Sequence, residues 1–198
     1  MKSALFCTML LLLTACDAGT DPAKVSALAP KMSSPATAPE IRTVAEMAAP
    51  PEPGGVGCAI EETPIFACNL ANGKRVAVCG LGEYIGQYRY GGSKPELVIN
   101  GADYANVMYS GGGESQIAFD NGGYRYIVFS RVVRTNFAAG EPSNPAMSDG
   151  VLILRGAKFI EMKLCSDLNG LPVQTNSANA IWEDERELFT AETVRADP

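Results

Sequence analysis

From Cys58 onward, the chain consists of short apolar runs that alternate with polar residues and are separated by turn dipeptides. Alternation with a period of two is typical of antiparallel strands with one buried face, and it does not suit long helices. The clearest example is a run over residues 65–70, a turn at Asn72-Gly73 and a second run over residues 75–79. We predict that these residues form a β-hairpin.

The turn allows two registers for this hairpin. A two-residue loop would pair Cys68 with Ala77 and would divide the apolar residues between both faces. A three-residue loop with a glycine bulge gathers them on one face, which can then be buried. We therefore favour the second register, whose buried face holds Phe66, Cys68, Leu70, Val76 and Val78.

Similar runs continue as far as residue 165. We predict further strands at residues 84–90, 96–99, 107–110, 115–119, 124–133, 150–154 and 159–165. Asn121-Gly122 and Arg155-Gly156 mark two more tight turns. The spacing predicts an all-β fold, a small antiparallel meander that forms either a barrel or a sandwich.

The chain divides into four segments. Residues 1–15 have the character of a signal peptide, and residues 16–56 that of a linker. Residues 17–55 hold seven prolines and nine alanines but no aromatic residue. Such a stretch cannot bury enough apolar surface to offset the entropy of ordering, so we expect a disordered tether. We assign residues 57–170 to the β domain and residues 171–198 to an acidic tail.

The tail contains one amphipathic pattern. Ile181, Trp182, Leu188 and Phe189 recur at helical spacing within residues 179–194, with acidic residues between them. This pattern predicts a short C-terminal helix. It would pack on the β domain, dock on a partner or cap an open end of a barrel.

The N-terminus carries an export signal. Lys2 precedes an apolar run over residues 4–13, which is shorter than the ~20 residues that a membrane-spanning helix needs. The next residues, Leu13-Thr14-Ala15-Cys16, resemble a bacterial lipobox. The resemblance implies a bacterial lipoprotein that is cleaved after Ala15. Cys16 would then carry a diacylglyceryl group on its thiol and a fatty acyl chain, such as palmitate, on its new amine.

We therefore expect the protein at the bacterial cell membrane, with its domain facing the periplasm. A single acyl chain binds a bilayer only weakly, whereas the two or three chains on Cys16 would make attachment effectively permanent. Asp17 follows the cysteine. In enteric bacteria, an aspartate at this position resembles the signal that retains lipoproteins in the inner membrane, so we favour the inner membrane.

Four cysteines remain in the predicted domain: Cys58, Cys68, Cys79 and Cys165. An even number in an exported chain predicts two disulfides, with three pairings open. A bridge between the first hairpin and Cys165 would close a long loop and stabilise the fold accordingly. A zinc site needs closely spaced ligand pairs, which are missing here. We expect neither a metal nor a cofactor.

Charge and composition exclude several functions. The net charge is −6, which argues against a nucleic-acid partner because phosphates require a basic surface. The chain has no histidine, so Ser-His-Asp and Cys-His catalysis are impossible within it. The domain is rich in carboxylates, but their spacing singles out no catalytic pair. We predict that the protein is not an enzyme and assign no catalytic residue.

Tyrosines and arginines supply a candidate binding surface. In each predicted strand, the tyrosines share one face and the arginine points the opposite way. Such a set binds a glycan or a protein surface, or else forms an aromatic ladder that supports the sheet. The residues are Tyr84, Tyr88, Tyr90, Tyr124, Tyr126, Arg89 and Arg125.

The domain also resembles a set of uncharacterised exported bacterial proteins. The similar segments are residues 66–69, 72–74, 88–91, 96–97, 117–119, 124–126, 150–152 and 164–165. The size, acyl anchor and disulfide-linked β fold are similar to those of membrane-bound inhibitors of c-type lysozyme. Their Ser-Gly-x-x-Tyr loop is not reproduced, because Ser110-Gly111 is followed by Gly112, Gly113 and Glu114.

The sequence thus predicts a lipid-anchored, non-enzymatic protein whose β domain binds another envelope component, either a protein or a glycan. Two alternatives remain open. One is an inhibitor of lysozyme or another basic hydrolase, for which an acidic surface is suited. The other is a small hydrolase that depends on carboxylates.

Overall fold

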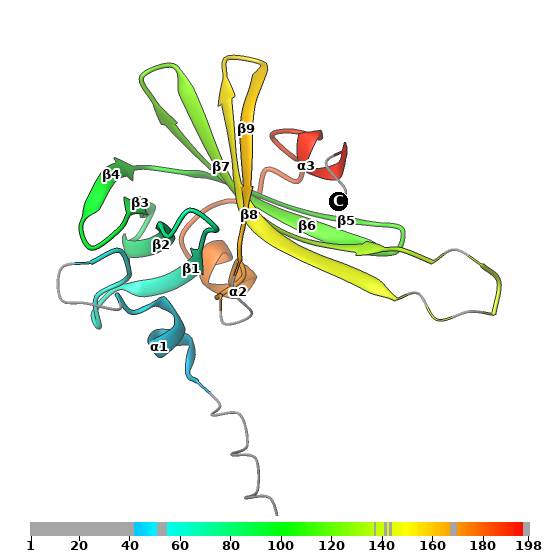
Figure 1. Cartoon of the computed structure of the whole chain (residues 1–198), viewed down its shortest axis with the longest axis horizontal. Coiled ribbons are helices and arrows are strands. Elements are labelled where there is room, and N and C mark those ends of the chain that lie inside the picture. Colours follow the sequence, from blue (N-terminus) through cyan, green and yellow to red (C-terminus); the bar gives the residue numbers. More distant parts are fainter. Residues whose placement is uncertain are drawn as a thin grey trace, which may run out of the picture. The chain divides into compact units, whose positions relative to one another are not determined.

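A computed structural model of the chain describes residues 42–50, 55–136, 138–140, 142, 144–166 and 170–195. The signal peptide, Cys16, Asp17 and most of the expected linker lie outside these residues. Within them the fold is all-β, as predicted, with two antiparallel sheets and short helices (Figure 1).

All the predicted strands are present. The first sheet has the order β1 (Thr63–Asn69), β2 (Arg75–Gly82), β3 (Ile85–Gly91) and β4 (Pro95–Asn100). The second sheet has the order β5 (Asp103–Tyr109), β6 (Gly112–Asn121), β7 (Tyr124–Arg134), β8 (Pro145–Arg155) and β9 (Lys158–Leu164). Each sheet is a meander in chain order, and the chain passes from one sheet to the other after β4.

The first hairpin adopts the favoured register. Cys68 lies opposite Val76, and Phe66 lies opposite Val78. The Leu70 N–H donates to the carbonyl of Lys74 at 2.8 Å, which leaves a three-residue loop. Gly73 ends that loop with a φ of 76°, a left-handed conformation that glycine adopts without steric cost.

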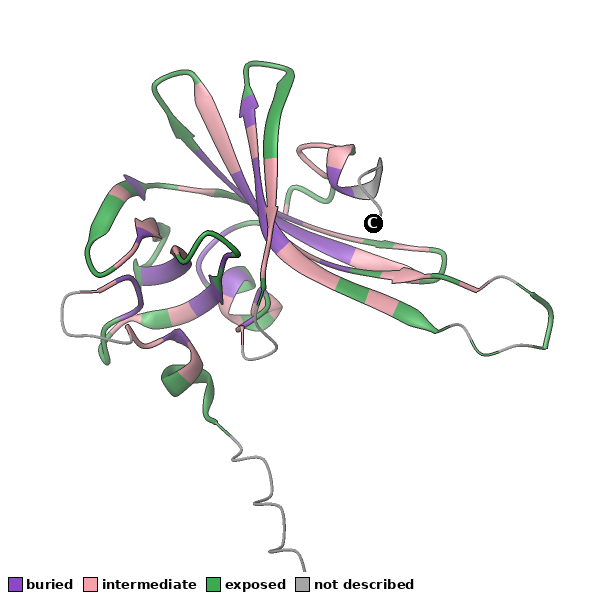
Figure 2. Cartoon of the chain, viewed as in Figure 1, coloured by how far each residue is buried: buried purple, intermediate pink, exposed green. Residues whose placement is uncertain are grey.

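The two sheets pack face to face on one core, so the fold is a sandwich rather than a closed barrel. Side chains from both sheets form this core, among them Phe66, Tyr88, Ile117 and Val128. Tyr88 joins the layers directly, because its ring centroid lies 5.6 Å from that of Phe119. The buried residues gather where the sheets meet, and the hairpin tips are exposed (Figure 2).

A short helix covers the outer face of the first sheet. Helix α1 (Val44–Ala48) begins with a capping box between Thr43 and Glu46. Ala48 and Val56 are fully buried in a cluster with Ala67 and Ala77 of β1 and β2. The described part of the expected linker is therefore packed on the domain. Its small apolar residues cover the alanines of the sheet, where composition alone suggested a tether.

The C-terminal segment is less regular than predicted. The predicted short C-terminal helix is present as α3 (Glu192–Arg195), and a second short helix, α2 (Thr175–Asn179), precedes it, but the residues between the two are not helical. Between them, Trp182 packs its ring on Gly86, where an added Cβ would lie 2.1 Å from a ring carbon. The apolar spacing at Ile181 and Trp182 therefore reflects insertion into the core and not a helix face.

Two disulfides link the predicted cysteines. Cys58 bonds to Cys79, and Cys68 bonds to Cys165, a residue 97 positions later in the chain. The second bridge joins β1 to the chain that leaves β9, so it fastens the two sheets together. Among the described residues, no helix has the length and apolar character needed to cross a bilayer.

Candidate functional site

The two sheets separate at one end and leave a cleft of about 400 Å³. We call it the sheet cleft. The first sheet contributes Leu70, Tyr88, Tyr90, Glu96 and Leu97, and the second contributes Tyr126, Val151, Ile153, Glu161 and Lys163. The outermost strands β4 and β9 both contribute to the lining.

Tyrosines and aliphatic residues form the lining. Tyr88 is only 2% exposed, and its ring centroid lies 5.7 Å from that of Tyr126. Burial raises the pKa of Tyr88 well above its usual range, so its hydroxyl stays protonated and can donate a hydrogen bond. The Tyr90 hydroxyl accepts a hydrogen bond from Asn72 Nδ2 at 3.3 Å. The lining thus combines apolar ring faces with a few polar tips.

Charged residues surround the opening. Glu96 pairs with Lys74, and Glu161 pairs with Lys163. The Glu96 carboxylate raises the pKa of Lys74, which keeps this lysine charged. Both glutamates are about half exposed, at 50% and 48%. The opening is therefore polar and mixed in charge, while the interior is apolar.

The structure brings together three of the predicted tyrosines, Tyr88, Tyr90 and Tyr126. Tyr84 differs from the prediction, because it lies in the turn before β3 with a φ of 60° and is 72% exposed. Tyr124 begins β7, and the Arg155 guanidinium lies 5.4 Å from its ring centroid. These two tyrosines do not line the cleft.

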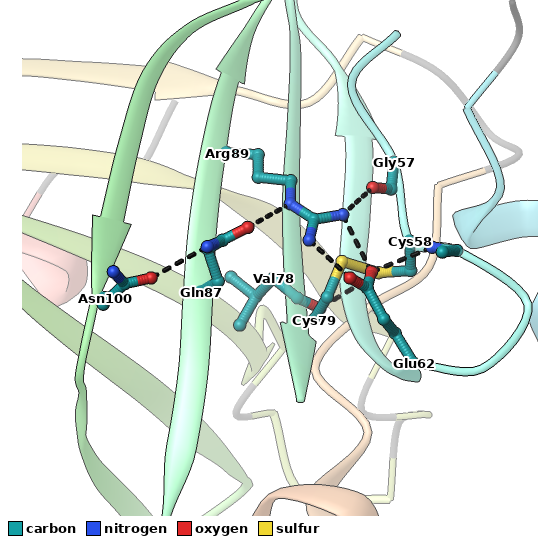
Figure 3. Close-up of polar contacts among 9 residues, drawn as sticks. Gly57, Cys58, Glu62, Val78, Cys79, Gln87, Arg89 and Asn100 are labelled. Atoms are coloured by element: carbon teal, nitrogen blue, oxygen red, sulfur yellow. Dashed lines mark hydrogen bonds and ion pairs between the residues drawn. A yellow bond between two sulfur atoms is a disulfide. The ribbon is translucent and has the colours of Figure 1, made fainter. Parts of the chain in front are cut away.

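The two predicted arginines pair with carboxylates and do not contribute to the cleft. Arg89 donates to both carboxylate oxygens of Glu62, at 2.6 and 2.8 Å, and to the oxygens of Gln87 and Gly57 (Figure 3). Arg125 donates to Asp103 at 2.7 Å on the second sheet. The prediction that both arginines point away from the tyrosines is correct, and neither arginine lines the cleft.

Glu62 lies beside the Cys58–Cys79 disulfide (Figure 3). Burial alone would raise the pKa of Glu62, but hydrogen bonds from Arg89 and the Ala59 N–H outweigh it and lower the pKa. Cys58, Glu62 and Cys79 are close enough to share a metal ion. The disulfide removes both thiolates, so this group cannot act as a zinc site while it is oxidised.

The sequence did not reveal the aliphatic and charged part of the cleft. Ile153, Glu161 and Lys163 come from the paired strands β8 and β9, and only the stacking of the sheets brings them beside Leu97 of β4. A partial signal was available, since Leu97 and Tyr90 are cross-strand neighbours in a predictable hairpin. The contact between sheets has no local signature.

The loop at Ser110-Gly111, compared above with the loop of lysozyme inhibitors, forms a tight turn. Ser110 and Gly111 connect Tyr109 of β5 to Gly112 of β6 as a two-residue loop.

Comparison with known protein families, with curated proteins and with solved structures finds no match for this chain. The function must therefore be argued from the geometry of the site.

Proposed function

We propose that this chain is a lipid-anchored protein of the bacterial envelope whose β domain binds another envelope component in the sheet cleft. The observation that carries the proposal is the cleft itself. Its volume of about 400 Å³ falls within the ~300–1,000 Å³ range of ligand sites. An apolar interior with a polar opening suits a ligand that inserts a ring or an aliphatic group.

The tyrosines support binding to a glycan or a protein side chain. Tyr88 and Tyr126 present ring faces, on which sugar rings and apolar side chains stack. The charges at Glu96, Glu161 and Lys163 would orient polar groups of the ligand. Acylation of Cys16 would hold the cleft close to the membrane surface.

The chemistry of the cleft favours binding over hydrolysis. Glu96 and Glu161 both line it, as a carboxylate-dependent hydrolase requires. However, an acid–base pair needs one carboxyl protonated near neutral pH, which burial in an apolar site normally achieves. Each of these glutamates is instead about half exposed and paired with a lysine, so neither has the apolar burial that such an acid requires.

A matched pair of variants on β4 tests the proposal. Leu97 lines the cleft, whereas its neighbour Val98 is 47% exposed and does not line it. Leu97→Trp should fill the cleft, and Val98→Trp should leave it open. Each full-length variant is expressed in the native host, captured from crosslinked membranes and checked for two disulfides by mass.

We expect one envelope component to enrich with the wild type and with Val98→Trp, and to fall at least about tenfold with Leu97→Trp. Equal enrichment with both variants would show that the cleft does not bind it. Enrichment of a secreted hydrolase that the protein slows, unaffected by Leu97→Trp, would favour the inhibitor alternative.

A further inference from the structure

Three tyrosine hydroxyls lie near one another in the sheet cleft. Tyr88 and Tyr90 alternate on the inner face of β3, and Tyr126 approaches them from β7 of the other sheet. Tyr88 is the most enclosed of the three, since it is buried and the other two are only partly so. Burial and the neighbouring Tyr126 and Tyr90 raise the pKa of Tyr88, which keeps its hydroxyl a hydrogen-bond donor.

The hydrogen-bonding capacity of these hydroxyls is largely unused within the chain. Among the described residues, the hydroxyls of Tyr88 and Tyr126 have no hydrogen-bond partner. The Tyr90 hydroxyl accepts from Asn72 Nδ2, so that contact leaves its own proton free to be donated. Polar groups as buried as Tyr88 are normally hydrogen-bonded. Each of the three tyrosines can therefore donate to a ligand that fills the cleft.

The charged residues of the lining are already paired. Glu96 pairs with Lys74, and Glu161 pairs with Lys163. The described lining contains no other charged residue. An ionic ligand would bring a charge for which the cleft has no free counter-charge, and the loss of its hydration would oppose binding. The pairing therefore favours an uncharged ligand.

Aliphatic side chains form the rest of the wall. Leu70 and Leu97 come from the first sheet, and Val151 and Ile153 come from the second. Binding is strongest when such a surface is covered by apolar groups of the ligand. The ligand must therefore present C–H groups as well as several hydrogen-bonding groups.

These requirements distinguish three classes of uncharged ligand. An acyl chain would cover the aliphatic wall but would leave the hydroxyls of Tyr88 and Tyr126 without water and without partners. An uncharged amino-acid side chain has at most two polar atoms, too few for three donors. A sugar ring presents C–H groups on its faces and hydroxyls around its edge, so it meets both requirements.

Given the proposed function, we propose that the envelope component bound in the sheet cleft is a glycan and that one of its uncharged sugar rings enters the cleft. This ligand class rests on the proposed function, because both concern the same cleft. Tyr88 is the specificity-determining residue, since a buried donor disfavours ligands that leave it unpaired.

Calorimetric titration of the full-length protein, purified from host membranes in a detergent without sugar, tests this ligand class. The neutral probes are cellobiose, maltose and N,N′-diacetylchitobiose. Chitobiose, the deacetylated form of the last, carries positive charge, and cyclohexanol has a six-membered ring with a single hydroxyl. We expect at least one neutral disaccharide to bind, and chitobiose and cyclohexanol to bind at least about tenfold more weakly.

Matched variants separate binding from folding. Tyr88→Phe removes a hydroxyl that has no partner among the described residues, so it should weaken disaccharide binding about tenfold or more without lowering the free energy of unfolding. Tyr124→Phe, at a tyrosine outside the cleft, should bind like the wild type. Leu97→Trp should abolish binding.

Failure of every neutral disaccharide to bind would overturn the assignment of a sugar. So would a Tyr88→Phe variant that binds like the wild type, or tighter binding of chitobiose or cyclohexanol. The membrane capture with Leu97→Trp and Val98→Trp distinguishes this failure from failure of the proposed function. A captured protein without glycan that only Leu97→Trp loses would refute the sugar alone, whereas equal capture by both variants would refute the role of the cleft itself.

Discussion

At the scale of single residues, Glu62 and Arg89 hold the N-terminal segment against the first sheet. Their side chains are only 14% and 15% exposed, and they form two hydrogen bonds with each other. Removing one partner of a buried pair leaves the other charge without compensation, which costs more than the pair itself contributes. The pair lies on the opposite face of β3 from Tyr88, so changes to it should leave the cleft intact.

We predict that Glu62→Gln lowers the free energy of unfolding at pH 7 by about 2 kcal/mol. The matched change Glu96→Gln, at a half-exposed pair, should cost less than about 0.5 kcal/mol. Urea unfolding of each variant measures both effects. Equal costs would contradict the assigned role of Glu62.

The same variant gives a pH prediction. Because the pKa of Glu62 is lowered from 4.5 in the folded state, its carboxylate contributes stability above that value. This contribution is lost as the pH falls through the lower, folded pKa. The difference in stability between wild type and Glu62→Gln should therefore shrink below pH 4.5, and a constant difference would show that Glu62 is not selectively stabilised as an anion.

At the scale of elements, residue alternation and turn residues account for the strands, whereas contacts between distant residues account for the irregular C-terminal segment. The first hairpin was predictable because alternation and Asn72-Gly73 both specify one register. The short C-terminal helix is present as α3, but Ile181 and Trp182 lie outside it, because Trp182 packs on Gly86 of β3. Short isolated helices are marginal, so a single tertiary contact can override their spacing.

The two disulfides should differ in their contribution to stability. The chain-entropy model gives about 5 kcal/mol for the loop of 97 residues between Cys68 and Cys165. It gives about 3 kcal/mol for the loop of 21 residues between Cys58 and Cys79. We expect the double alanine variant of Cys68 and Cys165 to unfold at a lower guanidinium concentration than that of Cys58 and Cys79. The reverse order would show that the second bridge does not hold the sheets together.

At the scale of the whole molecule, the sequence predicted an antiparallel meander, as a barrel or a sandwich, but not the cleft between its sheets. Tyr88, Tyr90 and Tyr126 stood out as a candidate surface because they alternate on strands. Their cross-strand neighbours Leu97 and Ile153, and Glu161 beside Ile153, did not. The residues of the two sheets face each other only because β3 and β4 stack on β7, β8 and β9. Nothing local marks the point after Asn100 where one sheet ends and the next begins.

The central proposal is that the chain is exported, lipidated and oxidised, because the binding role proposed for it in the envelope depends on all three. Cys16 lies outside the described residues, so this proposal rests on the resemblance of residues 13–16 to a lipobox and on the two disulfides, which are typical of exported proteins.

Intact mass spectrometry of the mature protein under non-reducing conditions tests this claim most directly. We predict a chain that begins at Cys16, carries the added mass of a diacylglyceryl group and an N-acyl chain, and lacks four hydrogens because two disulfides have formed. Cys16→Ser should abolish the lipid mass and leave the disulfides unchanged. A wild-type chain that retains Met1, has no lipid and keeps its thiols free would contradict the account.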